Sequence, residues 1–425
     1  MSPLLARIVA AMGAGAFGQA VNVLIQLASL PLFLYRWDLP TYGTWLMLSA
    51  LPAYLSMADV GMVSTAGNRM TMEMARDRVD VASAVFHSAS VFMAITCLVT
   101  AMLATPAVLL FPLPGLTNID ERTALLALIY SVLLTLIGGL ADAMFRATGR
   151  YALGASLGTL VRLAEWLGWI AGLLIWGSFA SVALCGLAAR TGGVLVSVYI
   201  SSRKAKGLRW GLSDASFAEV RAMVKPALSF MLFPLANAIS FQGATLLVGH
   251  LFGTTVVALF NTYRTIARVA VQVTGTFGHA LWAEFAHLFG QGGAHAVRAL
   301  YMRSTWLGIA ISVTLSLVLY GMAPWLLDVW THGRIDFEPM LMSLLLAYAA
   351  VCGSWHVPRV LLMATNQHIA LSAWVLAAAG GAAVLAYGLG HIWGITGVGM
   401  GILLAEMAIA LGCIGMARRM MVRPV

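Results

Sequence analysis

ATGRYAL (residues 147–153) and ATNQHIAL (residues 364–371) are two related segments about 217 residues apart, each in a short polar break between long apolar stretches. Other breaks in the chain repeat with nearly the same spacing, about 215–217 residues. A fixed internal spacing of this size indicates that one structural unit occurs twice. The two segments therefore predict a chain made of two similar halves in tandem.

The composition predicts that lipid solvates both halves. Of 425 residues, 61% are hydrophobic and only 10% are charged, far from the balance of a soluble protein. Apolar stretches of about 20 residues or more, enough to cross a hydrocarbon core, recur along the whole chain. The first stretch is too long for a removable signal peptide and is expected to span as well. The predicted spans are 8–35, 42–66, 83–111, 122–147, 153–178, 181–202, 226–253, 254–283, 301–329, 340–364, 369–390 and 394–417.

Twelve spans predict an all-α membrane protein with two parallel six-helix repeats around a central cavity. Because six is even, the second repeat enters the membrane in the same orientation as the first. The predicted parts are an N-terminal bundle (1–202), a linker (203–225) and a C-terminal bundle (226–425). Within the linker, Ser213 to Val224 has the pattern of a short amphipathic surface helix, although a plain solvated tether is an equal alternative.

Positive charge orients the chain. Of the 25 Lys and Arg residues, 17 fall on the N-terminal side of the membrane, three on the other side and five further inside spans. The positive-inside rule therefore predicts cytoplasmic termini. The net charge of +9 follows mostly from this topology and gives no reason to expect nucleic acid. The His residues show no metal-ligand spacing, and Cys97, Cys185, Cys352 and Cys413 are interpreted as small apolar residues, so neither a metal nor a cofactor is expected.

The arginines inside the spans are the strongest functional signal. In FNTYRTIARVAVQ (260–272), Arg264 and Arg268 are four residues apart, on one helix face and about 15 Å from the nearer surface. Facing lipid there would cost at least about 2.5 kcal/mol each, so we expect them to face protein or water. Arg162 and Arg190 are similarly deep, whereas Arg359 is near enough to a span end to snorkel.

Deep carboxylates are fewer than deep arginines. Glu165 lies three residues after Arg162 and Glu406 lies near the middle of the last span, while Asp59 lies near a span end. The resulting surplus of buried positive charge favours an anionic ligand over purely structural pairing, and guanidinium groups suit phosphate. Glu165, Glu406 and Asp59 are candidates for binding a coupling proton or sodium ion, with charge pairing as the simpler alternative.

Uncharged polar side chains gather on the first helices of both halves. Such side chains can hold helices together or line a hydrophilic path for a sugar. The candidate sugar contacts are Gln19, Asn22, Gln26, Asn237, Gln242 and Asn261.

Two segments carry a family resemblance. Residues 30–70, with the elements Tyr42-Gly43-Thr44-Trp45 and Asp59-Val60-Gly61, and residues 256–288 resemble the bacterial polysaccharide or O-antigen flippases. These flippases belong to the multidrug, oligosaccharidyl-lipid and polysaccharide exporter superfamily. The resemblance implies a bacterial inner-membrane protein that moves an undecaprenyl-diphosphate-linked oligosaccharide to the periplasmic leaflet by alternating access, alongside a polysaccharide polymerase complex. In this interpretation Arg264, Arg268, Arg162, Arg190 and Arg359 bind the diphosphate.

Three other functions remain open from the sequence. Drug exporters of the same superfamily have a similar length, but they typically use acidic cavity residues, and here the deep charge is positive. A membrane-embedded glycan enzyme would need a large external loop, and the longest external breaks, 112–121 and 330–339, are about ten residues long. If the protein were only a scaffold within an assembly complex, the deep arginines would have no evident function. The prediction is therefore a transporter and not an enzyme.

Overall fold

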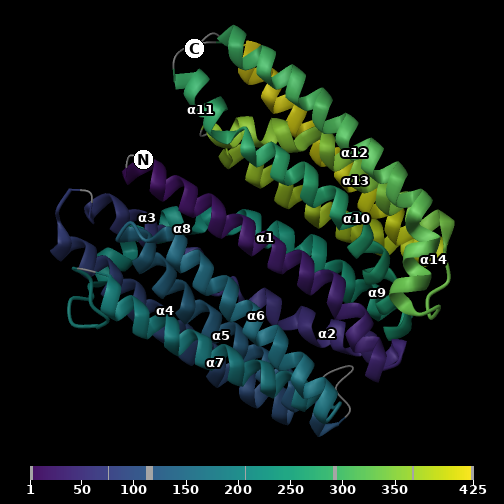
Figure 1. The fold of residues 1–425 in the computed structure, drawn as a ribbon, viewed down its shortest axis with the longest axis horizontal. Helices are drawn as coiled ribbons and strands as arrows, with labels where there is room; N and C mark the ends of the chain where they lie inside the picture. Colours follow the sequence, from purple (N-terminus) through teal and green to yellow (C-terminus); the bar gives the residue numbers. More distant parts are fainter. Residues whose placement is uncertain are drawn as a thin grey trace. The chain divides into compact units, whose positions relative to one another are not determined.

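The computed structural model describes residues 3–74, 76–111, 118–205, 207–290, 294–365 and 368–422. Every regular element among them is a helix (Figure 1). In chain order these elements are α1 (Pro3–Arg36), α2 (Leu39–Leu55), α3 (Met62–Met74), α4 (Val79–Leu110), α5 (Ile119–Ala147), α6 (Tyr151–Ile175), α7 (Phe179–Lys204), α8 (Phe217–Ala238), the π-helix η1 (Ile239–Gly243), α9 (Ala244–Phe252), α10 (Thr254–Ala280), α11 (Trp282–Gly290), α12 (Ala294–Thr331), α13 (Pro339–Ala364) and α14 (His368–Val422).

Nine helices in the described part of the chain are long and apolar enough to cross a membrane. The last of them, α14, holds two of the predicted spans, because Trp393 and Gly394 leave the helical conformation and Gly394 adopts a φ of +62°. The predicted span 254–283 corresponds to α10, whose two arginines lower its hydropathy. The predicted external break 112–121 lies mostly outside the described residues, as do Asn366 and Gln367 of the second repeated segment.

The predicted span 42–66 is not one unbroken helix, because the chain leaves the helical conformation between α2 and α3. Val60 and Gly61 adopt positive φ values of 51° and 77°. The Asp59 carboxylate accepts hydrogen bonds from the backbone N–H of Gly61 at 3.1 Å and of Val63 at 3.4 Å. Asp59 thus satisfies the N–H groups at the start of α3, which a new helix would otherwise leave open.

The structure combines the two alternatives for the segment from Ser213 to Val224. Residues 213–216 are not helical, and α8 begins at Phe217 and runs without interruption to Ala238. The segment just before α8 is held to α4 by hydrogen bonds to the His87 ring. The His87 ring lies 3.1 Å from the Arg209 carbonyl oxygen, and its Nδ1 accepts from the Asp214 N–H at 3.2 Å.

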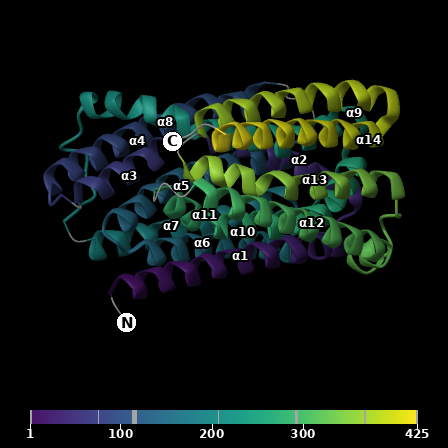
Figure 2. The same ribbon diagram turned by 90° about the horizontal axis from the view of Figure 1, so that it is seen from above.

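The chain divides into two compact units. One comprises Met1–Trp37 and Leu48–Met231, and the other comprises Asp38–Met47 and Leu232–Val425. In the first unit α5, α6 and α7 pack on one another, α6 packs on α1, and α3 packs on α4 and α5. In the second unit α13 packs against α10, α12 and α14, and α12, α13 and α14 run side by side in Figure 1 and Figure 2.

The two repeated segments, which start at Ala147 and Ala364, have matching local structure at their threonines. Thr148 ends α5 and Thr365 ends α13, with φ and ψ of −92° and 14° for Thr148 and −100° and 14° for Thr365. In each case the threonine hydroxyl donates to the carbonyl four residues earlier at 2.9 Å, Met144 in one half and Leu361 in the other. The two halves therefore end corresponding helices in the same way.

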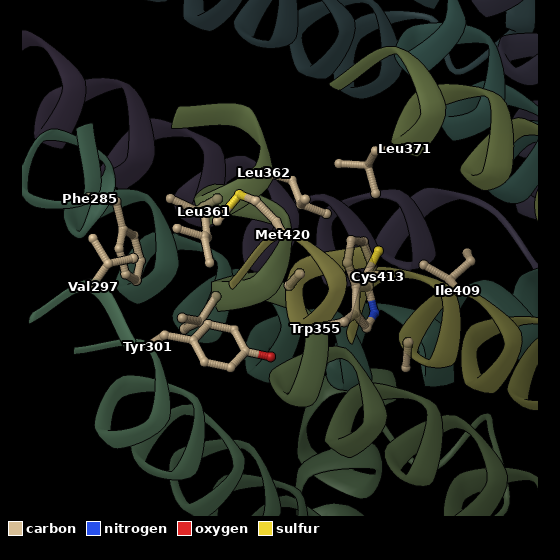
Figure 3. Close-up of a cluster of buried hydrophobic side chains, with 14 residues drawn as sticks. Phe285, Val297, Tyr301, Trp355, Leu361, Leu362, Leu371, Ile409, Cys413 and Met420 are labelled. Carbon is tan, nitrogen blue, oxygen red and sulfur yellow. The ribbon is translucent and has the colours of Figure 1, made fainter. Parts of the chain in front are cut away.

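The C-terminal unit has an apolar core between α11, α12, α13 and α14. Phe285, Tyr301, Leu361 and Met420 are buried, and the cluster includes Trp355 and Cys413 (Figure 3). Trp355 also donates a hydrogen bond from its ring nitrogen to Glu406. The core thus fixes the position of the helix face on which the candidate site is built.

In the N-terminal unit, the close approach of α6 to α7 requires glycine. A Cβ added at Gly168 would lie 2.6 Å from the Cys185 carbonyl oxygen, and one at Gly172 would overlap the Ser181 carbonyl oxygen. Gly158, on the same helix, has no atom within 4 Å of the corresponding position. The two helices can therefore pack at this distance only because residues 168 and 172 have no side chain.

We expect Gly168→Ala to lower the free energy of unfolding by about 1–3 kcal/mol, because an added methyl group must push α6 and α7 apart. Gly158→Ala is the matched control and should leave stability within about 0.5 kcal/mol. Thermal unfolding of the purified protein in detergent measures both. Equal stability of the two variants would show that the helices are not packed this closely.

Candidate functional site

The C-terminal unit contains a cavity of about 570 Å³. Its wall combines the end of α8 and η1 with faces of α10, α13 and α14. The charged side chains that line it are Arg264, Arg359 and Glu406, and Asn237 and Ser240 add neutral polar groups. Two of the predicted arginines and one predicted carboxylate, distant in sequence, are therefore brought to one cavity.

Arg264 is the most buried of the predicted arginines, with only 9% of its surface exposed. Its guanidinium donates to the Phe241 carbonyl oxygen at 2.8 Å, the Thr245 hydroxyl at 2.8 Å and the Asn261 side-chain oxygen at 2.5 Å. All three acceptors are neutral. Among the described residues no carboxylate forms an ion pair with Arg264, so its positive charge is solvated by dipoles and is not neutralised.

The π-helix η1 supplies part of this setting. Phe241 lies within it and presents both its carbonyl oxygen and its ring to Arg264, with the guanidinium carbon 5.3 Å from the ring centroid. Arg268 lies one turn further along α10 and has its guanidinium 5.0 Å from the same ring. Single turns of π-helix are often found at functional sites, because they leave carbonyl groups outside the regular α-helical pattern. The two cations share one aromatic ring and repel each other electrostatically.

Glu406 faces the same cavity from α14 and is 7% exposed. Its Oε1 accepts hydrogen bonds from Trp355 Nε1 at 2.6 Å and from Cys352 Sγ at 2.8 Å. Both donors lie on α13, three residues apart, as does Arg359, whose guanidinium is 5.7 Å from the Trp355 ring. Cys352 therefore does more than fill apolar space, which was its predicted role. The contact of α13 with Glu406 was not predicted, because nothing in the spacing of Tyr348, Cys352 and Trp355 shows that this helix faces α14.

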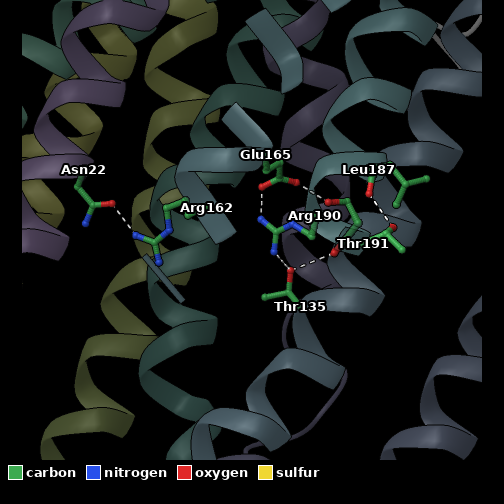
Figure 4. Close-up of polar contacts among 8 residues, drawn as sticks. Asn22, Thr135, Arg162, Glu165, Leu187, Arg190 and Thr191 are labelled. Carbon is green, nitrogen blue, oxygen red and sulfur yellow. Dashed lines mark hydrogen bonds and ion pairs between the residues drawn. The ribbon is translucent and has the colours of Figure 1, made fainter. Parts of the chain in front are cut away.

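The N-terminal unit has its own cavity, of about 420 Å³, between α5, α6 and α7. Arg162 and Arg190 both line it. Arg190 is ion-paired with Glu165 and also donates to the Thr135 hydroxyl, while the Ser131 hydroxyl donates to Glu165 (Figure 4). Although Glu165 lies three residues after Arg162 in the sequence, its carboxylate pairs with Arg190 of α7.

Arg162 has a neutral partner. It donates to the Asn22 side-chain oxygen of α1 at 2.5 Å (Figure 4). At the end of α5 and on the same cavity wall, Arg146 pairs with Asp142 at 3.0 Å. Arg146 and Arg190 at the N-terminal cavity are thus paired with carboxylates, whereas Arg264 at the C-terminal cavity has only neutral acceptors among the described residues.

The predicted sugar contacts are distributed over both units. Gln19 is exposed on α1, and Asn22 and Gln26 are half-buried on the same helix. Asn237 is exposed and lines the C-terminal cavity, and Gln242 is half-buried in η1. Asn261 is hydrogen-bonded within the protein. Its side-chain oxygen accepts a hydrogen bond from Arg264, and its side-chain amide donates to the Val257 carbonyl oxygen at 2.9 Å.

Known structures share this architecture. An inward-facing multidrug resistance MATE family transporter of the MOP superfamily matches with a TM-score of 0.74 and 14% identity, over 94% of this chain and 98% of that chain. Its outward-facing counterpart matches with a TM-score of 0.67 and 14% identity, over 98% and 95%. The chain has the MATE transporter fold. The predicted all-α architecture with two six-helix repeats is thereby confirmed.

A third similar structure is a MOP superfamily transporter from Pyrococcus furiosus Vc1 (DSM3638), for which a binding pocket of reverse polarity suggests a different function. It matches with a TM-score of 0.69 and 15% identity, over 98% of this chain and 95% of that chain. No protein-family model and no curated protein matches the chain. At these identities the similarity establishes the fold and leaves the transported substrate to the chemistry of the cavities.

We expect Glu165→Gln to destabilise the protein by about 3–5 kcal/mol, because it leaves the Arg190 cation buried without its counter-charge. The double variant Glu165→Gln/Arg190→Gln should recover much of this loss, since it removes both charges. Thermal unfolding of the wild type, both single variants and the double variant measures the coupling. Purely additive losses would contradict the pairing.

Proposed function

We propose that this protein is a flippase that moves an undecaprenyl-diphosphate-linked oligosaccharide from the cytoplasmic to the periplasmic leaflet of a bacterial inner membrane, by alternating access. The observation that carries the proposal is the cationic C-terminal cavity. Arg264 is buried there and hydrogen-bonded only to neutral acceptors among the described residues. An anion that enters the cavity adds the counter-charge that the described part of the protein does not supply to Arg264.

A diphosphate suits this cavity in charge and in geometry. Guanidinium groups offer parallel donors to phosphate oxygens and stay charged at any physiological pH. Arg264 and Arg359 line the cavity, and Arg268 lies one helical turn from Arg264. In this proposal Asn237 contacts the sugar next to the diphosphate, Gln19, Asn22, Gln26 and Gln242 line its path, and Asn261 holds Arg264 in place. The lipid tail stays in the surrounding bilayer.

The membrane setting follows from the same proposal. Both termini lie in the cytoplasm, where the excess of Lys and Arg in the breaks places them. The sugar donor is assembled on the cytoplasmic side and a polysaccharide polymerase complex uses it on the other side. The protein moves the lipid-linked sugar chemically unchanged and therefore is not an enzyme.

An exporter of small organic molecules is the second candidate. Two observations favour it: the multidrug transporters that share the fold, and the carboxylate of Glu406 in the cavity wall. Organic cations generally need an acidic cavity, and here Arg264 and Arg359 line the same cavity as Glu406. The local charge therefore favours an anionic cargo over a cationic drug.

We expect Arg264→Gln/Arg268→Gln to reduce surface glycan at least about tenfold in a strain that lacks the native protein. Hydrogen bonds from charged groups contribute about 1.5–3 kcal/mol each, which is one to two powers of ten in affinity. Arg298→Gln/Arg303→Gln, which removes two exposed charges of α12, is the matched control and should retain glycan display. Membrane levels of each variant are measured in parallel by immunoblot.

The same strains separate the two candidates. A flippase deletion changes surface glycan and leaves tolerance to organic cations unchanged. Full glycan display by the Arg264→Gln/Arg268→Gln variant would contradict the role of these arginines. Loss of drug tolerance with normal glycan would establish the small-molecule exporter in place of the flippase.

A further inference from the structure

The three carboxylates considered for ion coupling have different surroundings. Glu165 is neutralised by the Arg190 cation, and Asp59 accepts backbone N–H bonds at the start of α3. Glu406 instead lines a cavity, and the hydrogen bonds that the structure shows for it come from the neutral donors Trp355 and Cys352. Glu406 thus lines a cavity and accepts these hydrogen bonds from uncharged side chains, and Arg359 of α13 acts on it electrostatically.

The hydrogen bonds of Glu406 also distinguish its two oxygens. Trp355 Nε1 and Cys352 Sγ both donate to Oε1. Trp355 is itself packed within the apolar core, so the carboxylate has a defined orientation (Figure 3). A proton can therefore be added at Oε2 without loss of either hydrogen bond.

The groups around Glu406 carry more positive than negative charge. The titratable side chains that surround it or share its cavity are Arg264 from α10, Tyr348, Cys352, His356 and Arg359 from α13, and Cys413 from α14. The parts of α8 and η1 in the wall contribute the neutral Asn237 and Ser240. Glu406 is thus the one carboxylate among the described residues that line this cavity.

An anion in this cavity changes the electrostatic balance at Glu406. A phosphate group bound by Arg264 places negative charge in the same enclosed space as the Glu406 carboxylate, and like charges at close range in a low dielectric repel. A proton on Glu406 removes that repulsion and gives the anion an additional O–H donor. By thermodynamic reciprocity, a proton that strengthens anion binding is itself bound more tightly when the anion is present.

We propose that Glu406 is a proton-binding site whose occupancy is coupled to the anion, so that a phosphate-class anion in the C-terminal cavity and one proton at Oε2 favour each other. This inference rests on the proposed function, because it needs an anion at Arg264. It assigns a proton, and no metal ion, to the carboxylate. Glu165 and Asp59 have structural tasks in this account.

The test uses inorganic pyrophosphate as the probe and the full-length protein in detergent. Calorimetry at pH 5 to 8, in buffers with different heats of ionisation, gives the affinity and the protons taken up on binding. The titration of pyrophosphate itself is common to all variants, so the comparison between variants isolates the protein. We expect the affinity of the wild type relative to Glu406→Gln to fall about tenfold across this range, and we expect proton uptake by the protein to disappear in Glu406→Gln.

Glu338→Gln is the matched control, because its side chain is exposed in the same unit, and it should behave like the wild type. If Glu406→Gln fails to fold, infrared difference spectra of the wild type with and without pyrophosphate give the answer. We expect a neutral carboxyl band to appear on binding and to change frequency in Glu406→Asp but not in Glu338→Gln.

Each outcome decides one step of the inference. Equal pH dependence in wild type and Glu406→Gln, or an infrared band unchanged in Glu406→Asp, overturns the assignment of the proton to Glu406 while the anion site stands. If the wild type does not bind pyrophosphate at any pH, the anion site and the proposed function are wrong, and the coupling is wrong with them.

Discussion

The structure depends on how a buried guanidinium is stabilised inside a membrane. A charged side chain at bilayer depth costs at least about 2.5 kcal/mol unless protein, water or a ligand solvates it. Arg264 meets this constraint with a carbonyl, a hydroxyl, an amide oxygen and two aromatic rings. These groups accept its hydrogen bonds and leave its charge in place. The π-helix, Thr245 and Asn261 can all be understood as parts of one support that keeps a cation ready for an anion.

The two units stabilise the arginines inside their helices in different ways. In the N-terminal unit, Arg190 is compensated by Glu165, and Arg162 is tied to Asn22 of α1. In the C-terminal unit, the carboxylate that lines the same cavity as Arg264 is Glu406, and it accepts hydrogen bonds from Trp355 and Cys352 of α13. The two repeats therefore differ in how their arginines are compensated. An ion pair holds Arg190 in the N-terminal unit, whereas Arg264 in the C-terminal unit has only neutral acceptors among the described residues.

The sequence predicted the features that depend on spacing and composition. Repeated breaks and long apolar stretches predicted the all-α architecture with two six-helix repeats, and depth predicted that Arg264 would be buried within protein. The sequence could not show which helix faces meet. The pairing of Glu165 with Arg190 therefore could not be predicted. Nor could the hydrogen bonds of Cys352 and Trp355 to Glu406, because only the packing of α13 on α14 brings these residues together. The break after Leu55 was missed because the apolar pattern continues through it, and only the backbone bonds to Asp59 define it.

Leaflet translocation in reconstituted liposomes tests the central claim most directly. The wild type and Arg264→Gln are reconstituted with an undecaprenyl-diphosphate-linked oligosaccharide, and the fraction of sugar that reaches the outer leaflet is followed by lectin accessibility. The account predicts rapid translocation of intact substrate by the wild type and a rate at least about tenfold lower for Arg264→Gln, since hydrogen bonds to the diphosphate are lost. Equal rates for the two proteins, or no translocation by a folded wild type, would contradict it.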